Sequence, residues 1–137
     1  PLIVTDKGVV AAGIAGRVLE LIPQSNAVPR FEDTPSNPTE AAVSAACRVF
    51  DAEHCDGLIA VGGGSSIDLA KGLAIAATHD GALKTYATIE GGSAKISDRV
   101  LPLIAVPTTA GTGSEVARGA IVIVDDGSDP TGMLCGR

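Results

Sequence analysis

Aromatic side chains are nearly absent from this chain of 137 residues, which has no tryptophan, one tyrosine and two phenylalanines. Its hydrophobic fraction is nevertheless 45%, so we expect a core of Ala, Val, Ile and Leu, which suits helices packed closely on a parallel sheet. A chain of this length can form one domain with a sizeable core. The shortage of aromatic platforms, together with a formal net charge of −6, argues against a nucleic-acid partner.

Long apolar runs are also missing. No stretch approaches the roughly 20 apolar residues that a membrane-spanning helix needs, and no signal-peptide pattern is visible. Cys47, Cys55 and Cys135 show no C-x-x-C spacing. His54 and His79 lie in no ligand-spaced cluster. We therefore expect a cytoplasmic protein with no membrane partner, no disulfide framework and no metal site within this sequence.

Strand and helix signals alternate along the chain. Apolar runs predict strands over 2–5, 27–31, 57–61, 101–106 and 120–124, and helical periodicity predicts helices over 11–22, 39–53 and 66–77. The strands over 57–61 and 101–106 should be buried. The segment 78–98 should be a loop with a short helix near 83–86, and 125–127 is a turn signal. This order predicts an α/β fold with a mostly parallel sheet flanked by helices.

The most informative segment is a glycine-rich turn between a predicted strand and a predicted helix. Gly62-Gly63-Gly64-Ser65 directly follows the strand over 57–61. Glycine permits positive φ and close approach of a ligand, and a helix N-terminus offers free N–H groups to an anion. The dinucleotide fingerprint G-x-G-x-x-G is incomplete, because Ile67 replaces its third glycine, and the pattern is not a P-loop. We interpret this turn as a phosphate-binding element.

Asp68 has two interpretations, which are compatible with each other. With Ser65 it could form a capping box at the start of the helix, which is a purely structural role. It also lies one turn from the glycines, so its carboxylate could face the ligand groove.

A second turn rich in glycine and hydroxyl groups follows another predicted strand. It spans 108–115 and includes Thr108, Thr109, Thr112 and Ser114. Taken alone, such hydroxyls often bond only to nearby backbone groups. Both turns, however, leave the carboxyl ends of strands in one sheet, which is the edge where open α/β sheets bind ligands. We therefore interpret them as two walls of one nucleotide site.

An acidic pair, Glu32 and Asp33, follows the strand over 27–31. A carboxylate at this position can accept hydrogen bonds from ribose hydroxyls, and it repels a 2′-phosphate, which favours NAD over NADP. The alternative is an acidic loop that is simply solvated.

Three stretches of the chain resemble the iron-containing (group III) alcohol dehydrogenase family: 31–39 with its Asn37-Pro38-Thr39, 60–71, and 104–115. The resemblance covers residues 1–126 and implies a Rossmann-like NAD(P)-binding domain over 1–127. The cofactor contacts that it implies are Gly62, Gly63, Gly64 and Ser65 at the pyrophosphate, Asp68 near the nicotinamide, Thr108, Thr109, Thr112 and Ser114 along the groove, and Glu32 at the adenine ribose.

Members of this family also have a helical C-terminal domain that supplies an aspartate and three histidines to a divalent metal. The resemblance predicts that this sequence lacks that domain, that 128–137 is a tail unlike the family, and that the chain contributes no catalytic residue. Fe²⁺ or Zn²⁺ is expected only with the C-terminal domain. The implied reaction is hydride transfer between a small alcohol or aldehyde substrate and NAD, with NADP possible.

Two alternatives stay open. One is a related enzyme, such as a polyol-phosphate dehydrogenase or a dehydroquinate synthase-like lyase. The other is a non-catalytic nucleotide-binding module, suggested by the lack of metal ligands. We also expect apolar surface beside the cofactor groove, which would favour a homo-oligomer.

Overall fold

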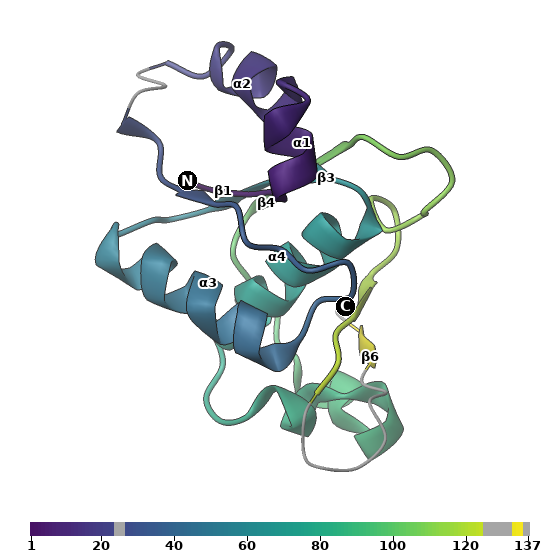
Figure 1. Ribbon diagram of the computed structural model, residues 1–137. Coiled ribbons are helices and arrows are strands. Elements are labelled where there is room, and N and C mark those ends of the chain that lie inside the picture. The colour runs from purple at the N-terminus through teal and green to yellow at the C-terminus, as the bar shows by residue number, and fades with distance from the viewer. Residues whose placement is uncertain (24–26, 125–132, 136–137) are drawn as a thin grey trace.

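The computed structural model of the chain describes residues 1–23, 27–124 and 133–135. Its centre is a four-stranded sheet in the order β2-β1-β3-β4. The strands are β1 (Leu2–Val4), β2 (Arg30–Phe31), β3 (Leu58–Gly62) and β4 (Leu103–Pro107). Every neighbouring pair in this sheet is parallel. The predicted α/β fold is therefore confirmed (Figure 1).

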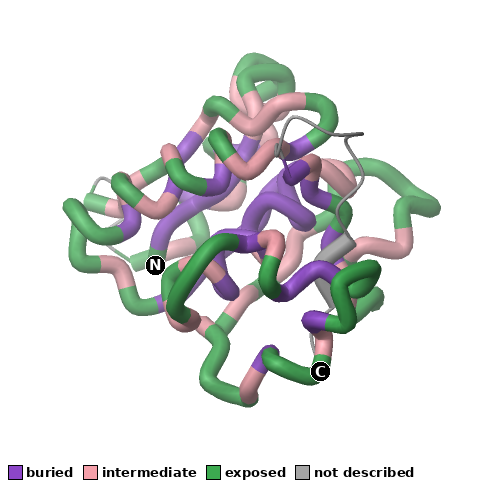
Figure 2. Tube along the Cα trace, turned by 90° about the horizontal axis from the view of Figure 1, so that it is seen from below, coloured by how far each residue is buried: buried purple, intermediate pink, exposed green. Residues whose placement is uncertain are grey.

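Helices cover both faces of the sheet (Figure 1). On one face, α3 (Glu40–Ala52) and α4 (Gly64–Ala76) share a buried apolar cluster with Leu58. On the other face, α2 (Ile14–Leu19) packs with Ile59. Because successive strand residues point to opposite faces, the apolar run of β3 serves both clusters and is buried throughout. Figure 2 shows the buried positions running through the centre of the molecule.

Helix α4 is deeply buried, as its nearly charge-free sequence predicts. It begins at Gly64, two residues before the predicted start, because Gly63 in extended conformation (φ −77°, ψ −168°) is the N-cap. The capping box is wrong: no side chain caps this helix, and Ser65 Oγ donates to the carbonyl of Ser36 instead. The Asp68 carboxylate accepts a hydrogen bond from the backbone N–H of Ile121 (3.1 Å).

The single helix predicted over 11–22 is wrong in its start and in its continuity. Asp6 caps a helix that begins earlier, α1 (Lys7–Ala11), by accepting from the N–H of Val9 (2.9 Å). Gly13 then takes a left-handed conformation (φ 74°) and separates α1 from α2. Glycine adopts this conformation without the cost that a side chain imposes, so the chain can turn there. The predicted apolar stripe still packs on the sheet, through Ile14, Val18 and Leu19.

The sequence correctly predicts a strand at β4, but the prediction that this strand is buried is wrong. Its residue Ile104 is 62% exposed. Among the described strands of this sheet, β4 pairs only with β3, and the apolar pattern of 101–106 does not distinguish an edge position from a central one.

The remaining elements lie close to their predicted positions. Thr39 caps α3 by accepting from the N–H of Ala42 (3.2 Å). A short helix is confirmed at η2 (Leu83–Tyr86), and η3 (Thr88–Glu90) and η4 (Gly92–Lys95) follow it. All three are 3₁₀ helices.

The C-terminal part of the fold adds a second, small sheet. In it, β5 (Gly119–Ile121) pairs antiparallel with β6 (Met133–Cys135). The turn predicted over 125–127 lies outside the described residues. Within the part of the chain that the structure describes, no helix has both the length and the apolar character to cross a membrane.

Candidate cofactor-binding site

The two glycine-rich turns lie side by side at one edge of the sheet. Gly62 at the end of β3 is in register with Pro107 at the end of β4. The N–H of Thr108 donates to the carbonyl of Gly62 (2.9 Å), which joins the first residues of both turns. The predicted juxtaposition of the turns at the carboxyl ends of parallel strands is therefore present.

A cleft of about 660 Å³ opens at this edge. Three chain segments line it: the start of α1 from Asp6 to Val9, the turn from Thr34 to Ser36, and the glycine-rich turn with Gly63, Gly64 and Ser65. Thr109 from the second glycine-rich turn, together with Ala12 and Ile14, completes the lining. The cleft thus gathers residues that follow four neighbouring strands of one sheet.

The first turn needs glycine for close approach. A Cβ at Gly62 would lie 2.3 Å from Ser66 Oγ, and one at Gly63 would lie 3.1 Å from Thr109 Oγ1. A Cβ at Gly64 would lie 3.0 Å from Ser114 Oγ. These three glycines do not have positive φ, so the reason for glycine here is space, and the conformational reason expected from the sequence does not apply.

The N-terminus of α4 faces the cleft through Gly64 and Ser65. The first hydrogen bond of this helix runs from the N–H of Ile67 to the carbonyl of Gly63 (3.3 Å). Because no side chain caps the helix, its first N–H groups are available to an anion, and the helix dipole favours negative charge at this end.

Thr34 is a second residue of the cleft with a polar group that lacks a partner. Its Oγ1 atom is buried and has no hydrogen-bond partner, and the residue lines the cleft. A buried polar group without a partner is costly in a folded protein. A ligand oxygen that reached this hydroxyl would remove that cost, so the residues present fit an oxygen-rich ligand such as a dinucleotide.

The predicted site residues divide into two groups. Gly63, Gly64, Ser65 and Thr109 line the cleft. The others do not line it: Glu32, Gly62, Asp68, Thr108, Thr112 and Ser114. Their contact with a cofactor stays a prediction, because the cleft residues alone do not decide it.

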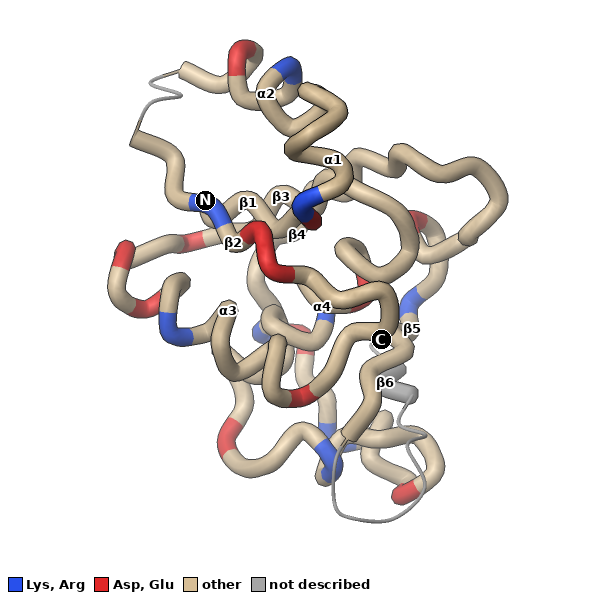
Figure 3. The backbone as a smooth tube through the Cα atoms, viewed as in Figure 1, with Lys and Arg blue, Asp and Glu red and all other residues tan. Residues whose placement is uncertain are grey.

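Glu32 has a partner of its own on β2, since its carboxylate lies 3.5 Å from Nε of Arg30. Its neighbour Asp33 pairs with Nζ of Lys7 at 2.6 Å. Figure 3 shows this acidic turn after β2 beside the basic start of α1. The acidic pair is therefore near the mouth of the cleft, where Lys7 is a lining residue.

Asp68 and Ser114 lie behind the first turn. The Asp68 residue is 8% exposed. Burial raises the pKa of Asp68, and the hydrogen bond from Ile121 and the charge of Lys71 oppose that rise. Ser114 packs against Gly64 from the second turn.

Sequence reasoning missed the contribution of 6–9 and of 34–36. A usable signal was available for the first of these, because Asp6, Lys7 and Gly8 form a polar turn directly after β1 and so end at the same sheet edge. The second, Thr34-Pro35-Ser36, is a turn-forming segment whose composition by itself indicates no ligand.

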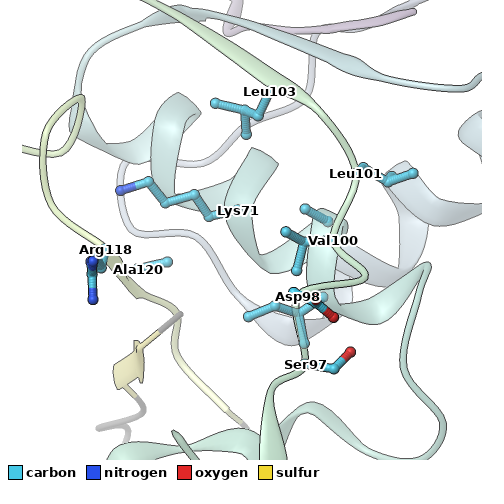
Figure 4. A pocket seen from close by; sticks show the side chains of 10 residues that line it. Lys71, Ser97, Asp98, Val100, Leu101, Leu103, Arg118 and Ala120 are labelled. Carbon is cyan, nitrogen blue, oxygen red and sulfur yellow. The ribbon is translucent and has the colours of Figure 1, made fainter. Parts of the chain in front are cut away.

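A separate cavity of about 330 Å³ lies between α4, β4 and β5. Figure 4 shows its lining, which is largely apolar and includes Leu101, Leu103 and Ala120. Among the described residues, no group of three or more His, Cys, Asp or Glu side chains could hold a metal ion.

Known proteins resemble this chain closely. The model of the iron-containing alcohol dehydrogenase family matches residues 1–134. The 4-hydroxybutyrate dehydrogenase of Cupriavidus necator is 68% identical over 127 residues, which cover 93% of this chain and 33% of that protein. The 1,3-propanediol dehydrogenase of Citrobacter freundii is 41% identical over 124 residues, covering 88% of this chain and 31% of that protein. The chain thus spans about a third of the length of these relatives.

Solved structures agree with this result. A 1,3-propanediol oxidoreductase matches with a TM-score of 0.84 and 34% identity, over 98% of this chain and 34% of that one. The sulfoacetaldehyde reductase from Bifidobacterium kashiwanohense, solved in complex with NAD⁺, matches with a TM-score of 0.83 and 31% identity, over 98% of this chain and 35% of that one. On sequence and on structure, the chain belongs to the iron-containing alcohol dehydrogenase family.

Proposed function

We propose that this chain binds NAD in the cleft at the ends of β1 to β4 and acts as the cofactor-binding part of an alcohol dehydrogenase. The observation that carries the proposal is the N-terminus of α4, which opens into the cleft through Gly64 and Ser65 without a capping side chain. A diphosphate is the part of NAD that this arrangement suits, because its charge and its oxygens match free N–H groups. The sulfoacetaldehyde reductase that was solved with NAD⁺ supports the choice of ligand.

The residues of the chain would bind and orient the cofactor. The backbone at Gly63 and Gly64 leaves room for the diphosphate, and the residues Ser65, Thr109 and Thr34 line the same cleft. When bound, the nicotinamide ring supplies the hydride chemistry, and the protein sets its position. We place Gly62, Asp68, Thr108, Thr112 and Ser114 as supports or further contacts of the same site, and we assign no catalytic residue to this chain.

NAD is the proposed cofactor in preference to NADP. Glu32 and Asp33 put two carboxylates near the mouth of the cleft, and Lys7 is already paired with Asp33. A 2′-phosphate there would meet negative charge without a free lysine at α1 to offset it. NADP binding as tight as NAD binding would contradict this preference.

The substrate class that we propose is a small alcohol or the matching aldehyde. The relatives named above are dehydrogenases of 4-hydroxybutyrate and 1,3-propanediol, which favours this reading over a polyol-phosphate dehydrogenase or a dehydroquinate synthase-like lyase. A divalent metal, Fe²⁺ or Zn²⁺, would polarise the alcohol oxygen in the whole enzyme. Since the described residues offer no metal cluster, we assign no metal-dependent step to this part of the chain. A cytoplasmic location and a homo-oligomer are further proposals.

Calorimetric titration with NAD⁺ tests the binding site directly. In Gly63→Val, the new side chain meets Thr109 Oγ1, since a Cβ alone would lie 3.1 Å from it, and it occupies the approach to the backbone. We expect a loss of affinity of about tenfold or more, as when a bound group loses a charge-assisted hydrogen bond. Gly16→Val is the matched control, because a Cβ there meets nothing within 4 Å and Gly16 lies outside the cleft. Equal affinities in wild type and Gly63→Val would refute this placement of the diphosphate.

A turnover assay tests whether this chain binds the cofactor without catalysing the reaction. With NAD⁺, 4-hydroxybutyrate or 1,3-propanediol, and added Fe²⁺ or Zn²⁺, we expect the chain to bind the cofactor without reducing it. Clear formation of NADH by this chain alone would overturn the assignment of a cofactor-binding part that lacks catalytic residues.

A further inference from the structure

Lys71 on α4 makes contacts that the proposed cofactor site does not by itself explain. Its ammonium donates to the carbonyl oxygens of Ser114 (2.5 Å), Ala117 (2.6 Å) and Gly119 (2.9 Å). An ammonium has three N–H donors, so these three bonds use all of them. Figure 4 shows the side chain extending from α4 to the segment that carries Arg118.

Two of the three carbonyls, those of Ser114 and Ala117, belong to a stretch of chain that has no regular structure, and the third is that of Gly119, the first residue of β5. No helix or strand lies between Pro107 at the end of β4 and Gly119 at the start of β5. Residues 115–118 are exposed, with Val116 at 83%. Apart from the bond of Thr108 to Gly62, the backbone hydrogen bonds of 108–118 are those of Val116 and Ala117 to the carbonyl of Gly113. The stretch therefore depends on contacts from other elements for its position.

Three carbonyl oxygens that point at one place repel one another unless a cation lies between them. Each carries a partial negative charge, and hydrogen bonds from a charged donor are stronger than those between neutral groups. The charged ammonium of Lys71 supplies both the positive charge and the three donors. This conformation of 114–119 is thus coupled to the protonated state of one side chain.

A second bond from the same helix holds the far end of the stretch. One turn before Lys71, the Asp68 carboxylate accepts from the N–H of Ile121 (3.1 Å). Together, the two side chains attach 114–121 to α4. That attachment places Ser114 Oγ against Gly64, 3.0 Å from where a Cβ would lie, and Thr112 Cβ at 3.5 Å from the same point.

We propose that Lys71 is a positioning residue for the dinucleotide: it holds the second glycine-rich turn against the first by gathering the carbonyls of Ser114, Ala117 and Gly119. The proposal rests on the proposed function of the cleft. Lys71 is absent from the cleft lining, so its effect on binding is indirect, through the wall that contains Thr109 and through the packing of Ser114 on Gly64.

Lys71→Met tests the proposal, because methionine keeps an unbranched apolar chain and removes the ammonium. We expect the affinity for NADH to fall by about tenfold or more, the size expected when hydrogen bonds to a charged group are lost. We also expect faster amide hydrogen exchange in 108–121, with β1 and β3 unchanged. Lys95→Met is the matched control, because Lys95 is exposed and lies in η4, away from both turns. Wild-type affinity, or unchanged exchange in 108–121, would overturn the proposal.

A pH series separates positioning from a general loss of stability. Burial lowers the pKa of the Lys71 ammonium, and the carboxylates of Asp68 and Glu115 oppose that effect. Arg118 and Asp98 are the other charged groups that line the cavity beside it. The NADH affinity of the wild type should fall as the pH rises through the pKa of Lys71, whereas Lys71→Arg, which stays charged, should show no such fall.

Both proposals have separate points of failure. If Lys71→Met does not fold, a wild-type affinity that stays constant up to pH 10.5, the ordinary lysine pKa, would overturn the positioning role. If the wild type does not bind NADH at all, the proposed function fails. In that case hydrogen exchange of the free protein still shows whether Lys71 orders 108–121.

Discussion

The two glycine-rich turns of the site use glycine for different physical reasons. In the first, the glycines do not have positive φ, and a Cβ at Gly62 would lie 2.3 Å from Ser66 Oγ. In the second, Gly111 and Gly113 have φ of 85° and 70°, and a Cβ at either would meet nothing within 4 Å. The first turn is thus limited by space and the second by backbone conformation. Turns of similar composition should therefore respond differently to the same substitution.

The largest expected effect is the loss of stability when a side chain is added in the first turn, where space is limited. Gly62→Ala should destabilise the fold by about 1–3 kcal/mol, the usual cost of overpacking a core, because Ser66 Oγ and Cβ lie at 2.3 and 2.7 Å from the added carbon. Urea unfolding measures the change. Gly16→Ala in α2 is the control and should stabilise the protein by about 0.5–1 kcal/mol, because its Cβ meets nothing and alanine favours a helix. If Gly62→Ala were as stable as the wild type, crowding would not be the reason for glycine at 62.

A smaller effect is expected where only the conformation is strained. Gly111→Ala should cost about 1 kcal/mol, because an L-residue pays for a left-handed conformation even in open space. We expect the loss of order to concentrate in 108–121, which hydrogen exchange can measure, and we expect weaker NAD⁺ binding.

Gly81→Ala provides the comparison for that result. Gly81 also has positive φ (97°) and open space, but it lies in the loop after α4 and not at the cleft. It should lose similar stability and keep the NAD⁺ affinity of the wild type. Equal losses of affinity in both variants would show that the second turn has no particular link to the site.

The smallest expected effect concerns the Asp68 bond that anchors the end of the second turn. Burial raises the pKa of Asp68 above its ordinary value of 3.8. The folded state therefore binds more protons than the unfolded state between 3.8 and the raised pKa. Stability should fall as the pH rises through that window. Asp68→Asn can still accept from Ile121 but does not titrate, so it should lack this fall. In urea unfolding, the free energy of unfolding of the wild type should therefore decrease relative to that of the variant from acid to neutral pH. The opposite trend would mean that the bond outweighs the burial.

Local patterns predicted the parts of the fold that depend on neighbouring residues. The strand that became β3 is an apolar run, and α3 begins where Thr39 can cap it. The two glycine-rich turns follow strands that pair in parallel, so their meeting at one edge follows from the order of elements. These features needed no knowledge of distant contacts.

Features that depend on distant partners were predicted less well. The break at Gly13 and the start of α1 at Asp6 are exceptions of local origin, in which a capping side chain and one left-handed residue outweighed the apolar stripe. The exposure of Ile104 depends on which strands lie beside β4, which its own pattern does not contain. Of the two interpretations of Asp68, the capping box is wrong, and the carboxylate instead accepts a hydrogen bond from Ile121, 53 residues away in the sequence.

The amino-acid sequence alone determined the order of strands and helices, the parallel sheet and the position of two side-chain-poor turns at its edge. Each of these follows from short-range periodicity and from where glycine stands. Only the tertiary structure decided that Lys71 meets the carbonyls of Ser114, Ala117 and Gly119, and that Thr34 Oγ1 has no partner in the cleft. Hydrogen bonds between residues far apart in sequence depend on how the elements pack, because burial sets both the cost of a missing partner and the distance to an available one.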